Sequence, residues 1–459
     1  MSAPAPVPQP TPGKALLLSR ALRTDGTRVK THPLESDGRF ARLQRFLFPA
    51  LIAFYAALPW IQVGGHPAVW LNITDRQFFL FGLTLNSTDF YLAFFVLTAI
   101  GFSLIVVSAL FGRVWCGYAC PQTVFLEGVF RRIEALVEGP ARKRQARDQG
   151  PWTADRVARL VVKHVLFVTT AFVVAHLFLA YFSSMDSVLW MMQHNPAENL
   201  TPFLWAMAIT GIMYFNFTWF REQLCIVICP YGRLQGALYD RETITVGYDA
   251  RRGEPRGKKG STTGDCVDCG KCVAVCPTGI DIRNGNQLEC VGCGHCVDAC
   301  NDIMTSLHRP TGLIRYDSLS GLEGQPRKFL RGRLYGYAVA ALAGLIALTT
   351  AVSMRKSFDA SLLRAQANPR ERVGEMVVER FVVHVASKSA QPRTFEITLQ
   401  APAEAQVVLP IKTLHLKAFE SQHIPVVVSL PFGHAGTPIL KMTTKEVESG
   451  RTREGQLPL

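Results

Sequence analysis

Long apolar runs dominate the chain up to residue 352. Five of them cover approximately residues 46–63, 90–111, 160–182, 203–220 and 334–352. A helix that crosses a bilayer needs roughly 17–25 apolar residues, so each run is long enough to span a membrane. A buried helix of a soluble protein is the alternative for any single run. The series of five predicts a polytopic α-helical membrane protein with five transmembrane helices.

The pattern changes after residue 356. Runs such as MVVERFVVHVAS and RTFEITL alternate apolar with polar residues and are rich in valine, isoleucine and phenylalanine. Proline or glycine separates one run from the next. Short alternating runs of this kind predict antiparallel strands, so we expect residues 357–459 to form an all-β, immunoglobulin-like sandwich.

Basic residues mark one side of the predicted membrane domain. The formal net charge of +14 favours either nucleic acid or an anionic membrane surface as a partner. Lysine and arginine gather beside the apolar runs, which favours the membrane and predicts no nucleic-acid partner. The segment before the first run and the connections after the second and fourth runs are rich in basic residues, whereas the connection after the first run has only Arg76 and that after the third has none. The positive-inside rule therefore places the N-terminus inside and the C-terminal domain outside.

The 12 cysteines fall in four tight groups, all in segments predicted to face the cytoplasm. A reducing compartment keeps closely spaced thiols free, so the grouping indicates metal ligands rather than disulfides. Eight cysteines between residues 266 and 300 repeat the spacing C-x2-C-x2-C-x3-C, with Pro277 after the first repeat and Asn301 after the second. This spacing is typical of bacterial ferredoxins with two [4Fe–4S] clusters.

In that pattern the fourth cysteine of each repeat binds the other cluster. We therefore expect a first cysteine set to bind one cluster: Cys266, Cys269, Cys272 and Cys300. A second cysteine set binds the other cluster: Cys276, Cys290, Cys293 and Cys296. Glycines 270, 292 and 294 let backbone amides approach the sulfurs. A pair of structural zinc sites is the alternative, although eight cysteines in this double spacing exceed what zinc needs.

The stretches WCGYACP and LCIVICP each place two cysteines four residues apart, then a proline, just beyond an apolar run. Cysteines at this spacing share one face of a helix, and a following proline marks where helical structure starts or bends. The two stretches indicate an internal repeat whose symmetry brings together a thiol quartet: Cys116, Cys120, Cys225 and Cys229. Four soft thiolates suit Cu(I), an iron–sulfur cluster or zinc. Buried thiols without a ligand are the remaining alternative. Arg113 and Arg221 precede the two pairs and are expected to keep the thiols deprotonated.

Two weaker candidates lie near the third run. His164 and His176 are ionisable groups within the run, but they do not share a helix face, which favours packing over a haem site. Thioether and imidazole groups, which can bind copper, follow the run at Met185, Met191, Met192 and His194. Interfacial packing is the alternative for that group, and its role stays open, as do the roles of the two histidines.

These patterns divide the chain into five parts. They are a disordered, basic cytoplasmic N-terminus at 1–45, a four-helix membrane domain at 46–240, a cytoplasmic 2[4Fe–4S] ferredoxin domain at 241–330, a fifth transmembrane helix at 331–356 and a periplasmic β-sandwich at 357–459. The [4Fe–4S] clusters expected in the ferredoxin domain indicate that the protein transfers electrons.

Two Cys-x3-Cys-Pro stretches at the ends of spans, a double ferredoxin motif, a fifth span and a C-terminal sandwich resemble the cytochrome c oxidase accessory protein family called CcoG, FixG or RdxA. The resemblance implies a bacterial inner-membrane oxidoreductase that reduces Cu(II) to Cu(I) for assembly of a cbb3-type cytochrome oxidase. It also implies oxidase assembly factors, or copper transporters or chaperones, as partners, together with an unidentified cytoplasmic electron donor. With that substrate, we expect the thiol quartet to hold copper transiently, and a third iron–sulfur cluster is the competing occupant.

Two other functions stay open at this stage. Membrane ferredoxins of nitrate and nitrous-oxide respiration also carry the Cys-x3-Cys-Pro device. The chain is therefore also interpretable as an electron-transfer subunit that serves quinone or a periplasmic reductase. A scaffold for assembly, with its clusters acting as a redox sensor, is the third interpretation.

Overall fold

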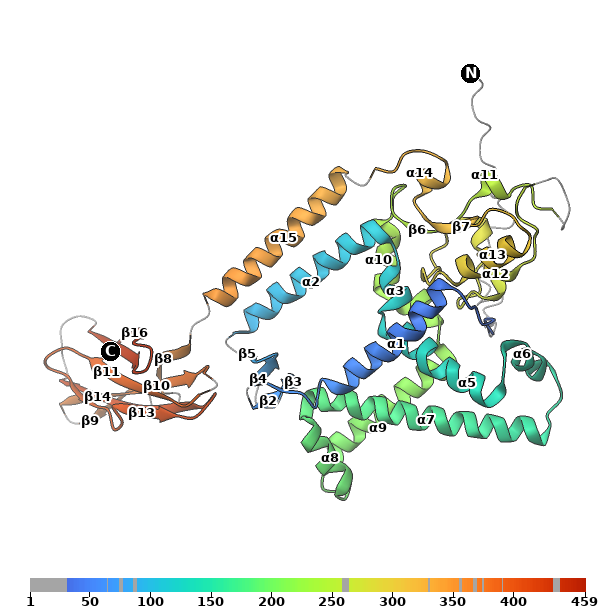
Figure 1. Cartoon of the computed structure of the whole chain (residues 1–459). Helices are drawn as coiled ribbons and strands as arrows, with labels where there is room; N and C mark the ends of the chain where they lie inside the picture. The colour runs from blue at the N-terminus through green and yellow to red at the C-terminus, as the bar shows by residue number, and fades with distance from the viewer. Residues whose placement is uncertain are drawn as a thin grey trace. The chain divides into compact units, whose positions relative to one another are not determined.

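The computed structural model describes eleven stretches of the chain: residues 31–63, 65–73, 77–85, 89–257, 264–328, 331–354, 357–365, 370–373, 375–389, 391–431 and 438–459. Residues 1–30 of the N-terminus predicted to be disordered, 1–45, lie outside this part, whereas the prediction is wrong from Arg39 onward, where a helix begins. The chain divides into two compact units (Figure 1). The first comprises Met1–Ile61 and Phe94–Ile346, and the second comprises Gln62–Ala93 and Ala347–Leu459.

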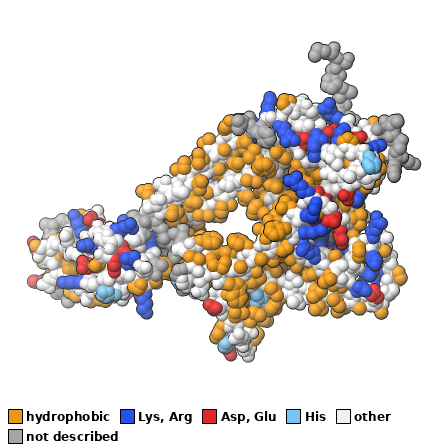
Figure 2. Space-filling model, in the orientation of Figure 1, with side chains coloured by type: hydrophobic (Ala, Val, Ile, Leu, Met, Phe, Trp, Pro, Cys, Tyr) orange, Lys and Arg blue, Asp and Glu red, His pale blue; other side chains and the backbone are white. Residues whose placement is uncertain are grey.

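Four helices in the described part of the chain are long and apolar enough to cross a membrane. They are α2 (Phe90–Phe111), α7 (Ala154–Ser183), α9 (Leu200–Phe215) with its π-helical continuation η3 (Asn216–Phe220), and α15 (Gly332–Ser353). None of the residues of α15 is buried, and the surface over this helix is largely apolar (Figure 2). A helix that is apolar all round and has no buried residue fits a lipid environment.

The first apolar run forms helix α1 (Arg39–Ala57), which starts seven residues earlier than its predicted span and continues through Pro49. Its first half carries three arginines, so it is not among the four strongly apolar helices. At the N-terminal end of α1, Asp298 Oδ2 accepts hydrogen bonds from the backbone amides of Phe40 and Ala41, at 2.9 Å each. Near its other end, the carbonyl of Tyr55 accepts a 2.6 Å hydrogen bond from Tyr181, two residues before the end of α7.

Short helices connect these elements and carry the cysteine pairs. After α2 come α3 (Val114–Tyr118), α4 (Pro121–Phe125), η2 (Leu126–Phe130), α5 (Arg131–Glu138) and α6 (Ala141–Gln149). Helix α8 (Met185–Gln193) follows α7, and the π-helix η4 (Leu224–Ile228) and α10 (Pro230–Leu238) follow η3.

The prediction that each Cys-x3-Cys pair lies on one helix is wrong. Cys120 and Cys229 are extended N-cap residues, and the helices that follow them begin at Pro121 and Pro230. Proline disfavours helical backbone in the residue before it, so the helix breaks at the second cysteine of each pair. The expected role of proline as the start of a helix is confirmed at both positions.

The ferredoxin region has a small core of its own. Strand β6 (Thr245–Tyr248) pairs antiparallel with β7 (Ile314–Asp317), and around them lie α11 (Ala250–Gly253), α12 (Lys271–Ala274), η5 (Ile282–Asn284), α13 (His295–Ser306) and α14 (Leu319–Leu322). Apolar residues from both strands and from α13 are buried together, among them Val246, Val297, Met304 and Ile314. Burying each such side chain contributes about 1.5–3 kcal/mol, which holds the cysteine loops on a packed base.

The second unit is rich in β-structure, as predicted. One sheet has the order β12–β14–β10–β8, with β9 also pairing β10, and another has the order β13–β11–β15–β16. The strands are β8 (Phe358–Arg364), β9 (Arg370–Val373), β10 (Met376–Ser387), β11 (Arg393–Gln400), β12 (Gln406–Val408), β13 (Thr413–Leu416), β14 (Ser421–Pro431), β15 (Ile439–Glu446) and β16 (Thr452–Pro458). Every second residue of β10 is buried, and both sheets contribute to one apolar core.

The connection between α1 and α2 belongs to this second unit, which the sequence pattern did not predict. It forms β1 (Gln62–Val63), β2 (His66–Pro67), β3 (Val69–Asn72), β4 (Gln77–Leu80) and β5 (Leu83–Leu85). Lys388 reaches Asp89 at 2.6 Å, and both side chains are buried. The ring of Phe419 packs against Phe79 with centroids 5.6 Å apart.

Candidate metal centres

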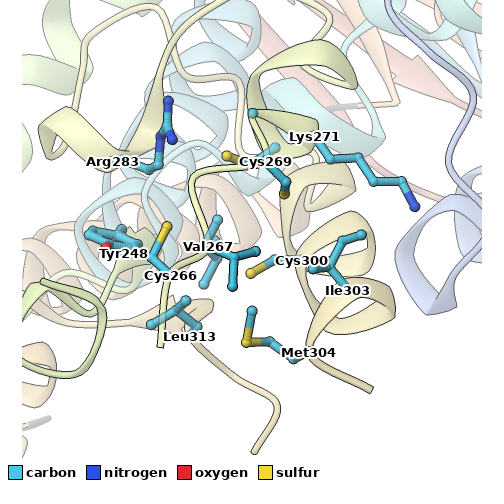
Figure 3. A pocket seen from close by; sticks show the side chains of 13 residues that line it. Tyr248, Cys266, Val267, Cys269, Lys271, Arg283, Cys300, Ile303, Met304 and Leu313 are labelled. Atoms are coloured by element: carbon cyan, nitrogen blue, oxygen red, sulfur yellow. The ribbon is translucent and has the colours of Figure 1, made fainter. Parts of the chain in front are cut away.

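The structure gathers the first cysteine set around one cavity. Cys266, Cys269 and Cys272 come from one loop and the turn of α12, while Cys300 comes from α13. Figure 3 shows three of these side chains around the space, together with Met304 and Leu313. Cys269 is the one exposed cysteine in the described part of the chain. The first site therefore has a solvent-facing edge.

The second cysteine set lines a neighbouring cavity. Cys272 lines both cavities, so the two sites adjoin. In each site three thiols from one repeat meet a fourth from the other, and four sulfurs that line one cavity suit a cubane cluster. Asn301 stands in the middle of α13, and its side chain accepts a 2.9 Å hydrogen bond from the backbone of Gly312.

Glycines shape the loops at these sites. Gly270 and Gly294 have positive φ angles of 66° and 79° and cap α12 and α13 at their N-termini. Gly292 has a φ of 64°, and its backbone amide donates to the sulfur of Cys290. Only glycine adopts such angles without steric cost, so these positions let the loops turn closely around the cavities.

Burial of the ferredoxin thiols disfavours their charged form. It raises the pKa of Cys272 to about 12 and the pKa values of Cys290 and Cys300 to about 11. The pKa values of Cys293 and Cys296 rise further for the same reason. Thiolates in such a pocket need a cation to compensate them, so loading of metal releases protons and is favoured by rising pH.

The structure also gathers the thiol quartet. Each cysteine of one pair acts electrostatically on cysteines of the other, although 109 residues separate Cys116 from Cys225. Burial raises the pKa of Cys116 and of Cys225 to about 12. The sulfur of Cys116 lies 3.8 Å from Oε1 of the fully buried Gln235. In the described residues no three His, Cys, Asp or Glu side chains lie close enough to hold one metal ion, and this applies to the quartet as well as to both ferredoxin sets.

The first Cys-x3-Cys stretch touches the second ferredoxin site directly. A Cβ added to Gly117 would lie 2.7 Å from the carbonyl oxygen of Gly292, so the two backbones are in contact. The hydroxyl of Tyr118 donates to the carbonyl of Cys293 at 3.1 Å. Gln44 of α1 donates to the Gly117 carbonyl at 2.9 Å, and its own Oε1 lies 2.6 Å from His295. The quartet and the second cysteine set are therefore neighbours joined by polar contacts.

Buried ion pairs, which the sequence analysis missed, cross-link the two repeats. Arg131 pairs with Glu127 at 2.7 Å and with Glu222 from the second repeat. Arg221, expected to keep a thiol ionised, instead pairs with Glu134 at 3.0 Å and is 2% exposed. Burial outweighs the Arg113 charge at Cys116, so the expected lowering of the thiol pKa values is not observed. These charges do not stand out in sequence because the basic connections contain many similar residues.

In the described residues the histidines among the weaker candidates belong to no group of three His, Cys, Asp or Glu side chains that could hold a metal ion. His164 contacts the hydroxyl of Tyr214 at 2.8 Å, and His176 contacts the carbonyl of Phe172 at 2.9 Å. His194 contacts the carbonyl of Trp190 on its own helix. Met185 is buried, whereas Met192 is 54% exposed. Each of the three histidines thus has a polar partner close to it in the structure.

Comparison with known proteins agrees with the cysteine pattern. Residues 220–319 match the family described as 4Fe-4S dicluster domain, and residues 92–140 match the family described as 4Fe-4S binding domain. The second match includes Cys116 and Cys120 of the quartet.

Curated relatives extend over much of the chain. It is 36% identical to "Nitrogen fixation protein FixG" of Rhizobium meliloti over 64% of its own length and 58% of the relative's. It is 35% identical to "Protein RdxA" of Cereibacter sphaeroides (72% and 74% of the two lengths) and 33% identical to "Protein RdxB" of that organism (83% and 84%). A solved FixG-related protein from Vibrio parahaemolyticus aligns with 23% of this chain and 96% of its own at 12% identity, but its TM-score of 0.19 carries no weight.

Proposed function

Since the chain belongs to the family of FixG, RdxA and RdxB and is an iron–sulfur electron-transfer protein, we propose that it is a cupric reductase. It reduces Cu(II) to Cu(I) at the thiol quartet and supplies copper for assembly of a cbb3-type cytochrome oxidase. The observation that carries the proposal is the backbone contact of Gly117 with Gly292. It joins a set of soft ligands to an iron–sulfur site.

The two cysteine sets are the proposed ligands of two [4Fe–4S] clusters, which when bound supply one-electron carriers. The exposed edge at Cys269 faces the solvent and is the proposed contact for a cytoplasmic electron donor. The second set, whose Cys293 is buried, lies against the first Cys-x3-Cys stretch. The chain thus orders its sites from an exposed entry to a buried exit.

The quartet favours the product of the reaction. Cu(I) prefers soft sulfur, whereas Cu(II) prefers nitrogen and oxygen ligands. One electron from a one-electron donor converts one Cu(II) to one Cu(I), and no bond to carbon is made or broken. Thiolates that bind Cu(I) more tightly therefore increase the driving force for reduction. Copper transporters, chaperones or oxidase assembly factors are the proposed recipients.

A third iron–sulfur cluster on the quartet is the second candidate, and two observations favour it. The quartet lacks the spacing of a single-ion site in the described residues, and the 4Fe-4S binding domain match includes two of its cysteines. With a cluster there, the chain would act as an electron-transfer subunit serving quinone or a periplasmic reductase.

The proposed topology has five spans in a bacterial inner membrane, with the ferredoxin domain in the cytoplasm. Helix α1 is the proposed span in addition to the four apolar helices. One of its ends contacts Asp298 of the ferredoxin domain, and the other contacts Tyr181 near the C-terminal end of α7. The connection after α1 packs with the C-terminal strands. The four apolar helices separate these two segments in the chain. An even number of crossings places the connection after α1 and the C-terminal strands on the same side of the membrane, which we assign to the periplasm. An immunoglobulin-like sandwich is the proposed fold of the C-terminal domain.

Fusions to alkaline phosphatase test this topology. An enzyme fused after Val428 is expected to be active, because the domain lies outside, whereas one fused after Ser306 in the ferredoxin domain is expected to be inactive. An inactive fusion after Val428, with the fusion protein present on immunoblots, contradicts the arrangement.

Substitution of Gly117 tests the contact that carries the proposal. Gly117→Ala places a Cβ 2.7 Å from the Gly292 carbonyl, closer than real Cβ contacts, so the backbones must separate. Forced overpacking of this kind costs about 1–3 kcal/mol, and we expect slower Cu(II) reduction with unchanged iron content. Gly211→Ala in α9 is the matched control, because its Cβ meets no atom within 4 Å. Equal rates for the two variants would remove the contact from the pathway.

The first direct experiment is anaerobic purification of the full chain, followed by analysis of iron, sulfide and copper. A Cu(II) reduction assay with dithionite-reduced protein completes it. Iron and sulfide without any copper reduction would support the electron-transfer subunit instead.

A further inference from the structure

Arg113 lies between the thiol quartet and the second cysteine set. It is the residue before α3 and is 5% exposed. Its guanidinium donates to the carbonyl of Gly232 in α10, in the second repeat. Its own carbonyl lies 3.2 Å from a Cβ built on Gly292, in the loop of the second cysteine set. One residue thus touches both repeats and the ferredoxin domain.

The charge of Arg113 reaches one sulfur of each site. Burial is the main cause that raises the pKa values of Cys116 and Cys290, and the Arg113 cation opposes the rise in both. The charges of Arg113 and of the same two sulfurs also act on the hydroxyl of Tyr239. The guanidinium is therefore within electrostatic range of the quartet and of the second site at once.

No carboxylate pairs with Arg113 in the part of the chain that the structure describes. Its Nε is buried without a hydrogen-bond partner. A buried cation without an opposite charge is strongly unfavourable. Arg131 and Arg221, by contrast, each face a buried glutamate. The anions available to balance Arg113 are the sulfurs of the two metal centres that it separates.

We propose that Arg113 is a positioning residue shared by both centres, with its guanidinium as the common counter-charge of the thiol quartet and the second cluster site. The inference rests on the proposed cluster at the second cysteine set, but not on copper at the quartet. A positive charge beside a cluster stabilises the reduced form, which carries one more negative charge. Arg113 therefore raises the reduction potential of the second cluster, which is the cluster nearest to the quartet. The transferred electron is then more stable on that cluster.

The first site offers a matched control. Arg283 lines the first cavity and acts on Cys272, but Asp281 and Asp268 both pair with it. Its charge is largely neutralised, so its removal is expected to change the potential of the first cluster less than removal of Arg113 changes that of the second.

The test is an anaerobic redox titration of the full-length protein, with both clusters followed by electron paramagnetic resonance. Arg113→Gln is expected to lower one of the two midpoint potentials by about 59 mV or more, a tenfold change in a one-electron equilibrium. Arg113→Lys keeps the charge and is expected to retain most of the wild-type potential. Arg283→Gln is expected to leave the potential affected by Arg113→Gln unchanged.

Two results would overturn the inference. One is that Arg113→Gln holds normal iron but leaves both potentials unchanged or shifts them equally. The other is that Arg113→Lys holds normal iron but has a midpoint potential as low as that expected for Arg113→Gln. If Arg113→Gln loses iron, the potential of Arg113→Lys alone tests the inference. Wild-type protein without iron would instead reject the proposed clusters, so failure of the function and of this inference are distinguishable.

Discussion

Serine at all four positions of the thiol quartet is expected to abolish copper binding and Cu(II) reduction while the protein keeps its full iron and sulfide. The physical reason is that hydroxyl oxygen is a poor ligand for Cu(I), whereas the eight ferredoxin cysteines are untouched. Copper per chain, reductase rate and visible absorbance of the clusters are the measurements. Preserved clusters show that loss of activity does not reflect general unfolding.

A control and a competing outcome sharpen this experiment. A variant with Met191→Leu and Met192→Leu removes thioethers from α8 and is expected to reduce copper at the wild-type rate, because these residues are not near the quartet motifs in the chain or in its hydrogen-bond network. If the quartet variant instead loses about a third of its iron, the quartet holds a third cluster and the copper assignment is rejected.

Replacement of one ferredoxin ligand is expected to remove one cluster. Wild-type protein should contain about eight iron atoms per chain, and Cys269→Ser should lose the spectroscopic signal of the first cluster and perturb that of the second. Cys269 is exposed, so the substitution disturbs packing little. The rate of Cu(II) reduction with a protein as electron donor should fall at least about tenfold. Iron analysis and low-temperature paramagnetic resonance measure the result.

Cys293→Ser is the companion variant, since Cys293 is buried and its carbonyl accepts from Tyr118. It should remove the second cluster and stop electron delivery to the quartet even when the first cluster remains. An anaerobic preparation that contains zinc and no iron would refute the clusters, and with them the assignment of electron transfer.

Several corrections come from local chemistry that the motifs did not report. The spacing predicts that the two cysteines of each pair share one helix face, but Pro121 and Pro230 begin new helices and leave the preceding cysteines extended. Arg221 was expected beside a thiol, but a buried glutamate holds it. In both cases a nearby group competes for the backbone or the side chain, and spacing alone does not reveal which interaction is stronger.

Sequence alone determined the features that depend on neighbours along the chain. The runs that form α2, α7, α9 and α15 are visible because a membrane span must be continuously apolar. The double ferredoxin spacing specified which cysteines share a cavity, because three ligands lie within one loop and the fourth is set by the repeat. The alternation of apolar and polar residues predicted the β-rich C-terminal region.

Tertiary structure decided what depends on distant segments. The contact of Gly117 with Gly292 joins positions 175 residues apart, and packing of the connection after α1 with the C-terminal strands joins positions still further apart. The lack of a carboxylate beside Arg113 in the described residues is likewise a property of the folded chain. A sequence pattern records the type and spacing of side chains. Which charges meet, and which remain to be balanced by a metal centre, is decided by packing that brings remote segments into a low-dielectric interior.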